Sequence, residues 1–305
     1  MNAVKLNLLQ RIGLEFLWAS ARLFAMTPHW FKYYLVEPLL FFLLYHCLRY
    51  RRRVVAENLG RSFPERSEAE RRTLCRKYYH TLAEVSIDTL NMAHMPPRKL
   101  RRAFSVRHVE EHNRAVAGRD WIAMLAHYGC WEYGSYWGLY AEQQMLVAAY
   151  HPLHNPVIEA FYRRLRGDGR IMRAVPMGDF LRFYLRHRDE GIEGRRLALG
   201  LIADQNPPLR PDSHWFRFLN QDTIFFDGGE KLARKCRLPV YFAKTGRTGR
   251  GRYTMSFEEI YDGSEPVADN EITERYVRRL EAMICERPEL WMWSHRRWKH
   301  KREEA

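Results

Sequence analysis

The stretch Asp120–Trp137 constrains the fold of this chain more than any other part of the sequence. Residues 122–126 form a compact apolar run that is typical of a buried strand, and Gly129 permits a sharp turn before the first turns of a helix. His127 closes the strand, and Glu132 follows five residues later. The two side chains can meet across such a turn, which would fix one tautomer of the imidazole and raise its basicity, as a general base needs. The alternative is a partly buried histidine and a helix-start glutamate that faces the helix dipole.

Apolar strands alternate with helical segments through most of the chain. This alternation predicts an α/β fold with a mostly parallel central sheet flanked by helices. Residues 245–252 carry three glycines and are predicted to form a loop between two strands. We expect an N-terminal unit at residues 1–50 and an α/β domain at residues 51–305. The further predicted strands are Met145–Tyr150, Ile171–Val175, Leu197–Ala203, Leu238–Lys244 and Tyr253–Glu258.

The most apolar stretch is residues 30–48, and it predicts an N-terminal helical region that associates with a membrane. Lys32, Glu37 and Pro38 interrupt it, so Leu39–Leu48 alone is too short to span a hydrocarbon core of ~30 Å. Arginines follow at once, where a positive cytoplasmic flank would lie. An interfacial helical hairpin and a tilted spanning helix both fit this pattern. A buried core helix is the alternative.

The charge balance predicts an anionic partner. Lysine and arginine total 50 against 36 acidic residues, a net charge of +14, which suits nucleic acid, anionic lipid or an acidic carrier protein. Nine tryptophans and the apolar N-terminal region favour lipid, and no common nucleic-acid motif is present. The five scattered cysteines indicate neither a disulfide framework nor a zinc site. His151 and His154 lack a recognisable third ligand, so no metal is expected.

Several motifs resemble those of a known family. The sequence from His127 to Glu132, HYGCWE, is similar to the H-x4-E/D motif of the lysophospholipid acyltransferase superfamily. Its form is closest to that of the late, or secondary, acyltransferases of bacterial lipid A biosynthesis, the lauroyl and myristoyl type. The resemblance spans most of the chain. Further motifs at family-like intervals are Asn58-Leu59 with Phe63-Pro64-Glu65, Asp204-Gln205, and Pro288–Lys299.

This resemblance implies a membrane-associated O-acyltransferase at the cell inner membrane, with its active site facing the cytoplasm. It would move a fatty acyl chain from acyl carrier protein, or less readily from coenzyme A, to a hydroxyl of a lipid A precursor, without a cofactor. His127 would be the base, and Glu132 would orient the imidazole and stabilise the imidazolium. Backbone N–H groups at the start of the helix at Trp131 are available to the oxyanion.

The resemblance also implies three substrate-binding residues. Arg173 matches in position an arginine that contacts substrate, and its guanidinium suits the phosphate of an anionic acceptor or of phosphopantetheine. Asp204 matches the acidic residue of a later motif. Residues just beyond the carboxyl ends of parallel strands line the ligand crevice, which favours Asp204 and Gln205 as site residues. Arg173 as a surface charge, and Asp204 as a loop-structuring residue, are the alternatives.

Other functions compete with this reading. Cys130 lies close enough to His127 in sequence to suggest an acyl-enzyme, although the family transfers directly. The same dyad would serve an acyltransferase acting on a lysophospholipid, a glycolipid or an amino-acid lipid. The stretch after Asp204-Gln205, Trp215–Asp222 followed by Asp227-Gly-Gly229, departs from the family's usual phenylalanine- and glycine-rich pattern. From another class, a non-catalytic basic membrane-surface protein would explain the charge but not the motifs. A metal-dependent hydrolase has no visible ligand set.

Overall fold

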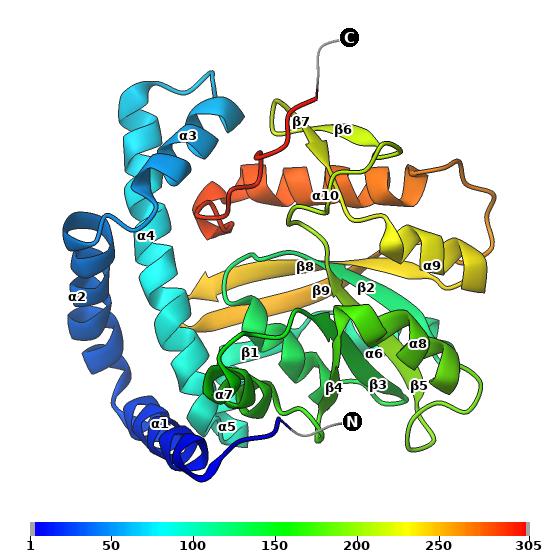
Figure 1. The fold of residues 1–305 in the computed structure, drawn as a ribbon, viewed down its shortest axis with the longest axis horizontal. Coiled ribbons are helices and arrows are strands. Elements are labelled where there is room, and N and C mark those ends of the chain that lie inside the picture. Colours follow the sequence, from blue (N-terminus) through cyan, green and yellow to red (C-terminus); the bar gives the residue numbers. More distant parts are fainter. Residues whose placement is uncertain (1–3, 303–305) are drawn as a thin grey trace.

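A mostly parallel sheet forms the centre of the computed structural model, which describes residues 4–302 (Figure 1). In these residues the sheet has seven strands in the order β1-β9-β8-β2-β5-β3-β4, and only β8 and β9 pair antiparallel. The predicted α/β fold is therefore confirmed. A separate antiparallel hairpin is formed by β6 (Trp215–Phe218) and β7 (Gln221–Ile224). The seven strands are β1 (Phe104–Val106), β2 (Trp121–Leu125), β3 (Gln144–Tyr150), β4 (Met172–Pro176), β5 (Arg196–Ile202), β8 (Val240–Gly249) and β9 (Arg252–Tyr261).

Helices cover both faces of the sheet, which explains why β2 is apolar throughout and β5 is apolar after its first residue, Arg196. One face packs against α8 (Met177–His187), α9 (Gly228–Cys236) and α10 (Glu271–Glu286). The other face packs against η4 (Trp131–Leu139) and α7 (Pro156–Arg166). Figure 1 shows α9 and α10 above the sheet and α7 below it. The short helices α5 (Pro97–Ala103) and α6 (Val109–Ala115) flank β1.

The helix expected after the central strand is a 3₁₀-helix, η4. Its sequence is rich in aromatic residues and glycine, which are poor α-helix formers. Gly138 also passes very close to the chain before β4, since a Cβ there would lie 2.2 Å from the carbonyl oxygen of Ile171. This tight turn places the residues after His127 against the sheet.

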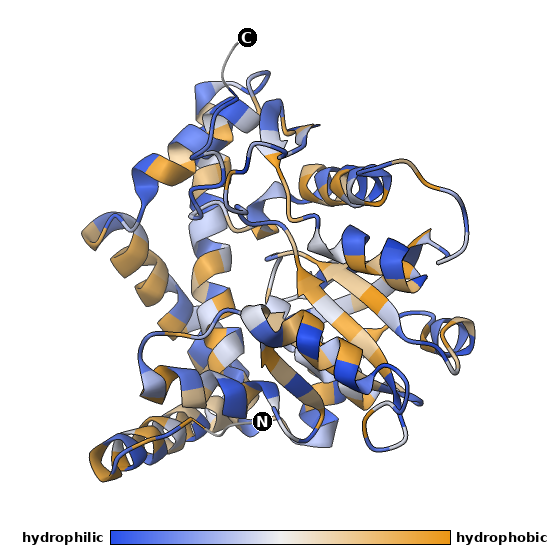
Figure 2. Cartoon of the chain, turned by 45° about the vertical axis from the view of Figure 1, so that its right-hand side comes forward, coloured by the Kyte–Doolittle hydropathy of each residue, from blue (hydrophilic) through white to orange (hydrophobic). Residues whose placement is uncertain are grey.

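The N-terminal helices form an outer layer against α4 (Glu68–Asn91), which begins with a capping box between Ser67 and Glu70. This layer contains α1 (Leu8–Met26), then η1 (Phe31–Val36), α2 (Glu37–Phe42) and η2 (Leu43–Cys47), and then α3 (Arg52–Ser62). Figure 2 shows apolar residues along α1 at the edge of the molecule. Leu9 and Phe16 of α1 are 78% and 75% exposed.

Within residues 4–302, no single helix is both long and apolar enough to cross a bilayer. Phe31–Cys47 and Arg52–Ser62 meet the length and composition requirement together, but a bend of 89° separates them.

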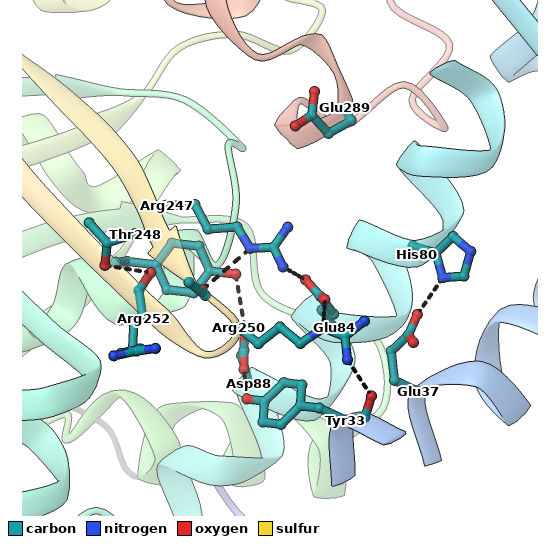
Figure 3. A network of polar contacts seen from close by, with 12 residues as sticks. Tyr33, Glu37, His80, Glu84, Asp88, Arg247, Thr248, Arg250, Arg252 and Glu289 are labelled. Carbon is teal, nitrogen blue, oxygen red and sulfur yellow. Dashed lines mark hydrogen bonds and ion pairs between the residues drawn. The ribbon is translucent and has the colours of Figure 1, made fainter. Parts of the chain in front are cut away.

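The predicted loop at residues 245–252 is wrong, because β8 and β9 extend to a tight turn at Arg250-Gly251. Long pairing with β9 overrides the weak strand preference of the glycines. Gly251 has φ +65°, and a Cβ there would lie 2.3 Å from Tyr33 Oη, so only glycine lets the turn approach η1 this closely. Asp88 of α4 accepts hydrogen bonds from Tyr33 and Tyr253, which fixes this hairpin against the N-terminal layer (Figure 3).

Candidate active site

Strand register brings His127 and Asp204 together. β2 and β5 are parallel neighbours with Leu125 opposite Ile202, so the positions two residues beyond each strand face one another. His127 Nδ1 lies 2.7 Å from Asp204 Oδ1, and the His127 backbone N–H donates to Asp204 Oδ2 at 2.9 Å. The same carboxylate therefore fixes both the imidazole ring and the backbone of the turn that carries it.

Asp204 is a buried carboxylate that accepts every hydrogen bond it makes. It also accepts from Trp291 Nε1 at 2.8 Å, and its side chain is only 2% exposed. Burial alone would raise its pKa, but the adjacent imidazole and the hydrogen bonds from His127 and Trp291 lower the pKa below its ordinary value. An ionised Asp204 requires a proton on His127 Nδ1, which leaves Nε2 as the basic nitrogen.

The basic nitrogen faces a cavity. Gln205 Nε2 lies 3.3 Å from His127 Nε2, and both side chains line a cavity of about 390 Å³ at the carboxyl ends of the strands. The cavity lies on the sheet face that η4 and α7 cover. Its lining is mainly apolar where the sheet forms the wall, through Leu125, Leu146, Ala148, Met172, Ala174, Gly200 and Ile202.

The C-terminal motif holds the histidine turn in place. Gly129 N donates to Leu290 O at 2.8 Å, and Met292 N donates to His127 O at 3.1 Å. The Asn58 amide in turn donates to Trp293 O at 2.9 Å. Three of the motifs that carried the family resemblance thus meet around His127.

Glu132 does not make the predicted hydrogen bond to His127. Its carboxylate accepts two hydrogen bonds from Arg166, from Nε at 2.6 Å and from Nη2 at 2.7 Å. A two-point contact with a guanidinium is a strong geometric preference, whereas Asp204 already occupies Nδ1 of the imidazole. Glu132 and Arg166 both line the cavity, so this ion pair remains part of the site.

Removing one member of this ion pair should destabilise the fold. In Glu132→Gln, the Arg166 guanidinium loses its charged partner, and we expect a loss of about 2 kcal/mol of unfolding free energy. That figure is below the cost for a fully buried pair because part of Arg166 reaches solvent. Urea denaturation measures it, with Glu132→Gln combined with Arg166→Gln as the matched control. The control should recover part of the loss, and an unchanged single variant would contradict the role of the pair.

The structure does not bring Arg173 to the cavity. Side chains alternate along β4, so Met172 and Ala174 line the cavity while Arg173 points to the other face. There its Nη2 pairs with Glu193 at 2.5 Å. Arg173 therefore contacts an acidic loop residue and not the groups around His127.

Cys130 lies apart from the cavity despite its place in the motif. Its thiol is buried and lies 3.9 Å from Thr89 Oγ1 on the far side of the turn. Burial, together with the nearby charges of Asp88 and Glu132, raises the pKa of this thiol well above its ordinary value. A thiol that resists ionisation is a poor nucleophile. Within residues 4–302, no three His, Cys, Asp or Glu side chains lie close enough together to hold a metal ion.

Sequence reasoning missed two residues of the site, Arg166 and Trp291. Arg166 is the last residue of α7, and Gly167 with φ +71° ends that helix there. The sequence offered one indication of Arg166, a basic helix that ends at a glycine. This pattern predicts where the helix ends but not which carboxylate its last arginine contacts. Trp291 lay within the C-terminal motif, and its indole could equally have been a packing group.

Residues 4–300 match the family of bacterial lipid A biosynthesis acyltransferases. No curated protein matches the chain significantly. The family match covers the histidine turn, Asp204-Gln205, Arg166 and the C-terminal motif in one span. The chain therefore belongs to the bacterial lipid A biosynthesis acyltransferase family.

Proposed function

We propose that this protein transfers a fatty acyl chain from acyl carrier protein to a hydroxyl of a lipid A precursor, by direct attack. The observation that carries the proposal is the His127–Asp204 pair, whose second imidazole nitrogen, Nε2, faces a cavity with an apolar wall. A general base beside an apolar cavity is what the transfer of a long acyl chain to an alcohol needs. No cofactor or metal takes part, and coenzyme A is the alternative carrier of the chain.

The reaction begins at His127. Nε2 takes the proton of the acceptor hydroxyl while that oxygen attacks the thioester carbonyl. The tetrahedral intermediate then collapses, the C–S bond breaks, and the imidazolium returns the proton to the departing thiolate. Asp204 stabilises the imidazolium and keeps the ring in the tautomer that exposes Nε2. The products are the acylated lipid and the free thiol of the carrier.

The oxyanion needs positive charge at the cavity wall, and Arg166 is suited to supply it. Glu132 occupies Nε and Nη2 of the guanidinium, and among the described residues Nη1 has no hydrogen-bond partner. We assign to Glu132 the role of holding Arg166 toward the reacting carbonyl. Backbone N–H groups at the start of η4 and the Gln205 amide are further donors beside His127.

The apolar wall of the cavity is assigned to the acyl chain. Gly200 forms part of this wall, and a Cβ there would meet Leu146 and Ala148 only at 3.5–3.8 Å. Gly200→Leu would therefore extend into the cavity and shorten the preferred acyl chain. Competition between acyl donors of different lengths, followed by mass spectrometry of the product, measures the shift. Gly200→Ala is the matched control and should keep the wild-type preference, while an unchanged preference in both variants would place the chain elsewhere.

Membrane attachment is assigned to the N-terminal layer. Exposed apolar side chains on α1, such as Leu9 and Phe16, suit the interface of the inner membrane on its cytoplasmic side. The net charge of +14 favours an acidic carrier protein and an anionic lipid alike.

Mass spectrometry of lipid A from a deletion strain tests the proposed function. Loss of one acyl chain, restored by the wild-type gene and not by His127→Ala, is the expected result. An intact lipid A profile with one altered phospholipid, glycolipid or amino-acid lipid would assign the same site to that acceptor. If the purified protein binds lipid but transfers no acyl chain from any donor, the protein is a membrane-surface binding protein.

A further inference from the structure

A second and larger cavity, of about 1040 Å³, lies away from His127 and is strongly basic. It lies between the end of α1, α5 and the turn of the β8–β9 hairpin, and it shares no lining residue with the first cavity. Among the described residues that line it, none is Asp or Glu. We call it the basic cleft, and its cations are Lys32, Arg98, Lys99, Arg102, Arg250 and Arg252.

Two lysines converge on one carbonyl group at the base of the cleft. Lys32 Nζ and Lys99 Nζ both donate to Ala25 O, at 3.1 and 2.8 Å, near the C-terminal end of α1. Lys32 is 3% exposed and also donates to Asn91 Oδ1 at 2.7 Å. The negative end of the helix dipole holds the two ammonium groups together against their mutual repulsion. Positive charge at this place is therefore fixed by the fold.

Three exposed arginines stand at the rim without a countercharge. In residues 4–302, no ion pair involves Arg98, Arg102 or Arg252. In Figure 3 the Arg252 side chain points away from Glu84. Arg250 differs, because it pairs with Glu84 at 3.2 Å and donates to Tyr33 O at 2.8 Å (Figure 3). Arg250 fixes the hairpin, and the other three are free to meet an anion.

The positive charge of the cleft is only partly neutralised by nearby carboxylates. The buried Asp88 lies behind Lys32 and partly offsets its charge. Burial and then the charge of Lys99 still lower the pKa of Lys32 to about 8. An anion in the cleft would relieve this repulsion, which is why the unpaired charge indicates a ligand site and not a solvated surface.

The mouth of the cleft adjoins an apolar surface. Met26 lines the cleft, and Trp30 and Tyr34 lie on the adjoining turns of the N-terminal layer, exposed by 58% and 65%. Aromatic residues beside clustered arginines are typical of the level of lipid headgroups. We propose that the basic cleft binds the phosphate group of a membrane lipid while the neighbouring apolar side chains enter the bilayer.

The surroundings favour a lipid over an acidic protein partner. An acidic carrier protein would present carboxylates to the rim but would leave the exposed apolar side chains beside it in water. A lipid satisfies both surfaces at once, because its phosphate and its chains are adjacent. The inference rests on the proposed membrane attachment but not on the acyl-transfer chemistry.

Vesicle binding by matched variants tests the site. One variant carries Arg98→Gln, Arg102→Gln and Arg252→Gln. The control carries Arg114→Gln, Arg186→Gln and Arg210→Gln, which removes the same charge from exposed positions away from the cleft that form no ion pair among the described residues. Sedimentation measures binding to phosphatidylcholine vesicles that contain either phosphatidic acid or oleic acid at equal surface charge. Melting temperatures check that both variants fold.

We expect the cleft variant to bind phosphatidic acid vesicles about 100-fold more weakly than wild type, and the control to lose much less. On oleic acid vesicles the two variants should bind alike. If both variants lose equal affinity for phosphatidic acid vesicles, or if the cleft variant binds oleic acid vesicles as much more weakly than the control as it binds phosphatidic acid vesicles, general charge attraction explains the binding and the proposal is overturned. If glycerol 3-phosphate raises the melting temperature of the control but not of the cleft variant, while both variants bind vesicles equally, the site binds a free phosphate ester and not a lipid. Acyl-transfer rates do not enter this test, so it can fail while the proposed function stands.

Discussion

Purified His127→Ala is expected to transfer acyl chains about 10³-fold more slowly than wild type. The variant loses the base that takes the hydroxyl proton, and proton transfer by a positioned side chain contributes about 10²–10⁴-fold to a rate. The loss should fall on kcat, because the apolar wall of the cavity, to which we assign the acyl chain, is unchanged. Initial rates with acyl carrier protein thioesters and a lipid A precursor measure the effect.

Cys130→Ala is the control for this experiment. It removes the other nucleophilic side chain of the motif, and because the thiol lies outside the cavity most of the activity should remain. Comparable losses in His127→Ala and Cys130→Ala would contradict direct transfer. They would instead indicate an acyl-enzyme on the cysteine.

Asp204→Asn is expected to lower kcat about 10³–10⁴-fold, which is similar to the effect of His127→Ala, although the amide has nearly the same size and shape as the carboxylate. Asp204 accepts from His127 Nδ1, from the His127 backbone and from Trp291, so all three of its partners are donors. An amide must turn its own N–H₂ toward one of them. If this N–H₂ group faces His127 Nδ1, it favours the tautomer that carries the proton on Nε2. An imidazole in that tautomer cannot act as the base.

Glu132→Gln is the comparison that decides which carboxylate serves His127. If Asp204 is the partner, Asp204→Asn loses far more activity per folded molecule than Glu132→Gln. Glu132→Gln should lower stability, and it should also lower activity by a smaller factor, because Arg166 is then held less firmly toward the reacting carbonyl. Near wild-type activity in Asp204→Asn, with a loss of about 10³-fold in Glu132→Gln, would restore the His127–Glu132 dyad that the motif predicts. Denaturation curves for both variants separate loss of folded protein from loss of chemistry.

The sequence predicted His127, Asp204 and Gln205 as site residues but not how the first two pair. A spacing of five residues puts His127 and Glu132 near one turn. The local sequence does not determine whether their side chains form a hydrogen bond. The actual partner is 77 residues away, and only the register of β2 on β5 brings it close. Register between strands distant in sequence depends on packing across the whole sheet, which one chain read alone does not reveal.

Other parts of the fold were predicted to different degrees. The apolar run of β5 is a local signal, so this strand appears where it was expected. Arg173 could not be placed in this way. Side chains alternate between the two faces of β4, so a shift of one residue decides whether Arg173 reaches the cavity, and the sequence does not fix that alternation. The glycines at residues 245–252 predict a loop, whereas tertiary pairing places Gly246 and Gly249 in β8 and leaves only Gly251 in the turn.

The hydrogen bonds that Leu290, Trp291 and Met292 make with the histidine turn and with Asp204 have a consequence for biosynthesis. On the ribosome, β2 and β5 can pair before residues 290–292 have been made. The carboxylate of Asp204 then lacks its indole donor, and the turn at His127 lacks two of its backbone bonds. A nascent chain therefore cannot hold His127 and Asp204 in their final geometry until this C-terminal motif has been made. Premature termination shortly before residue 290 yields a product that contains both His127 and Asp204 but does not fix their geometry.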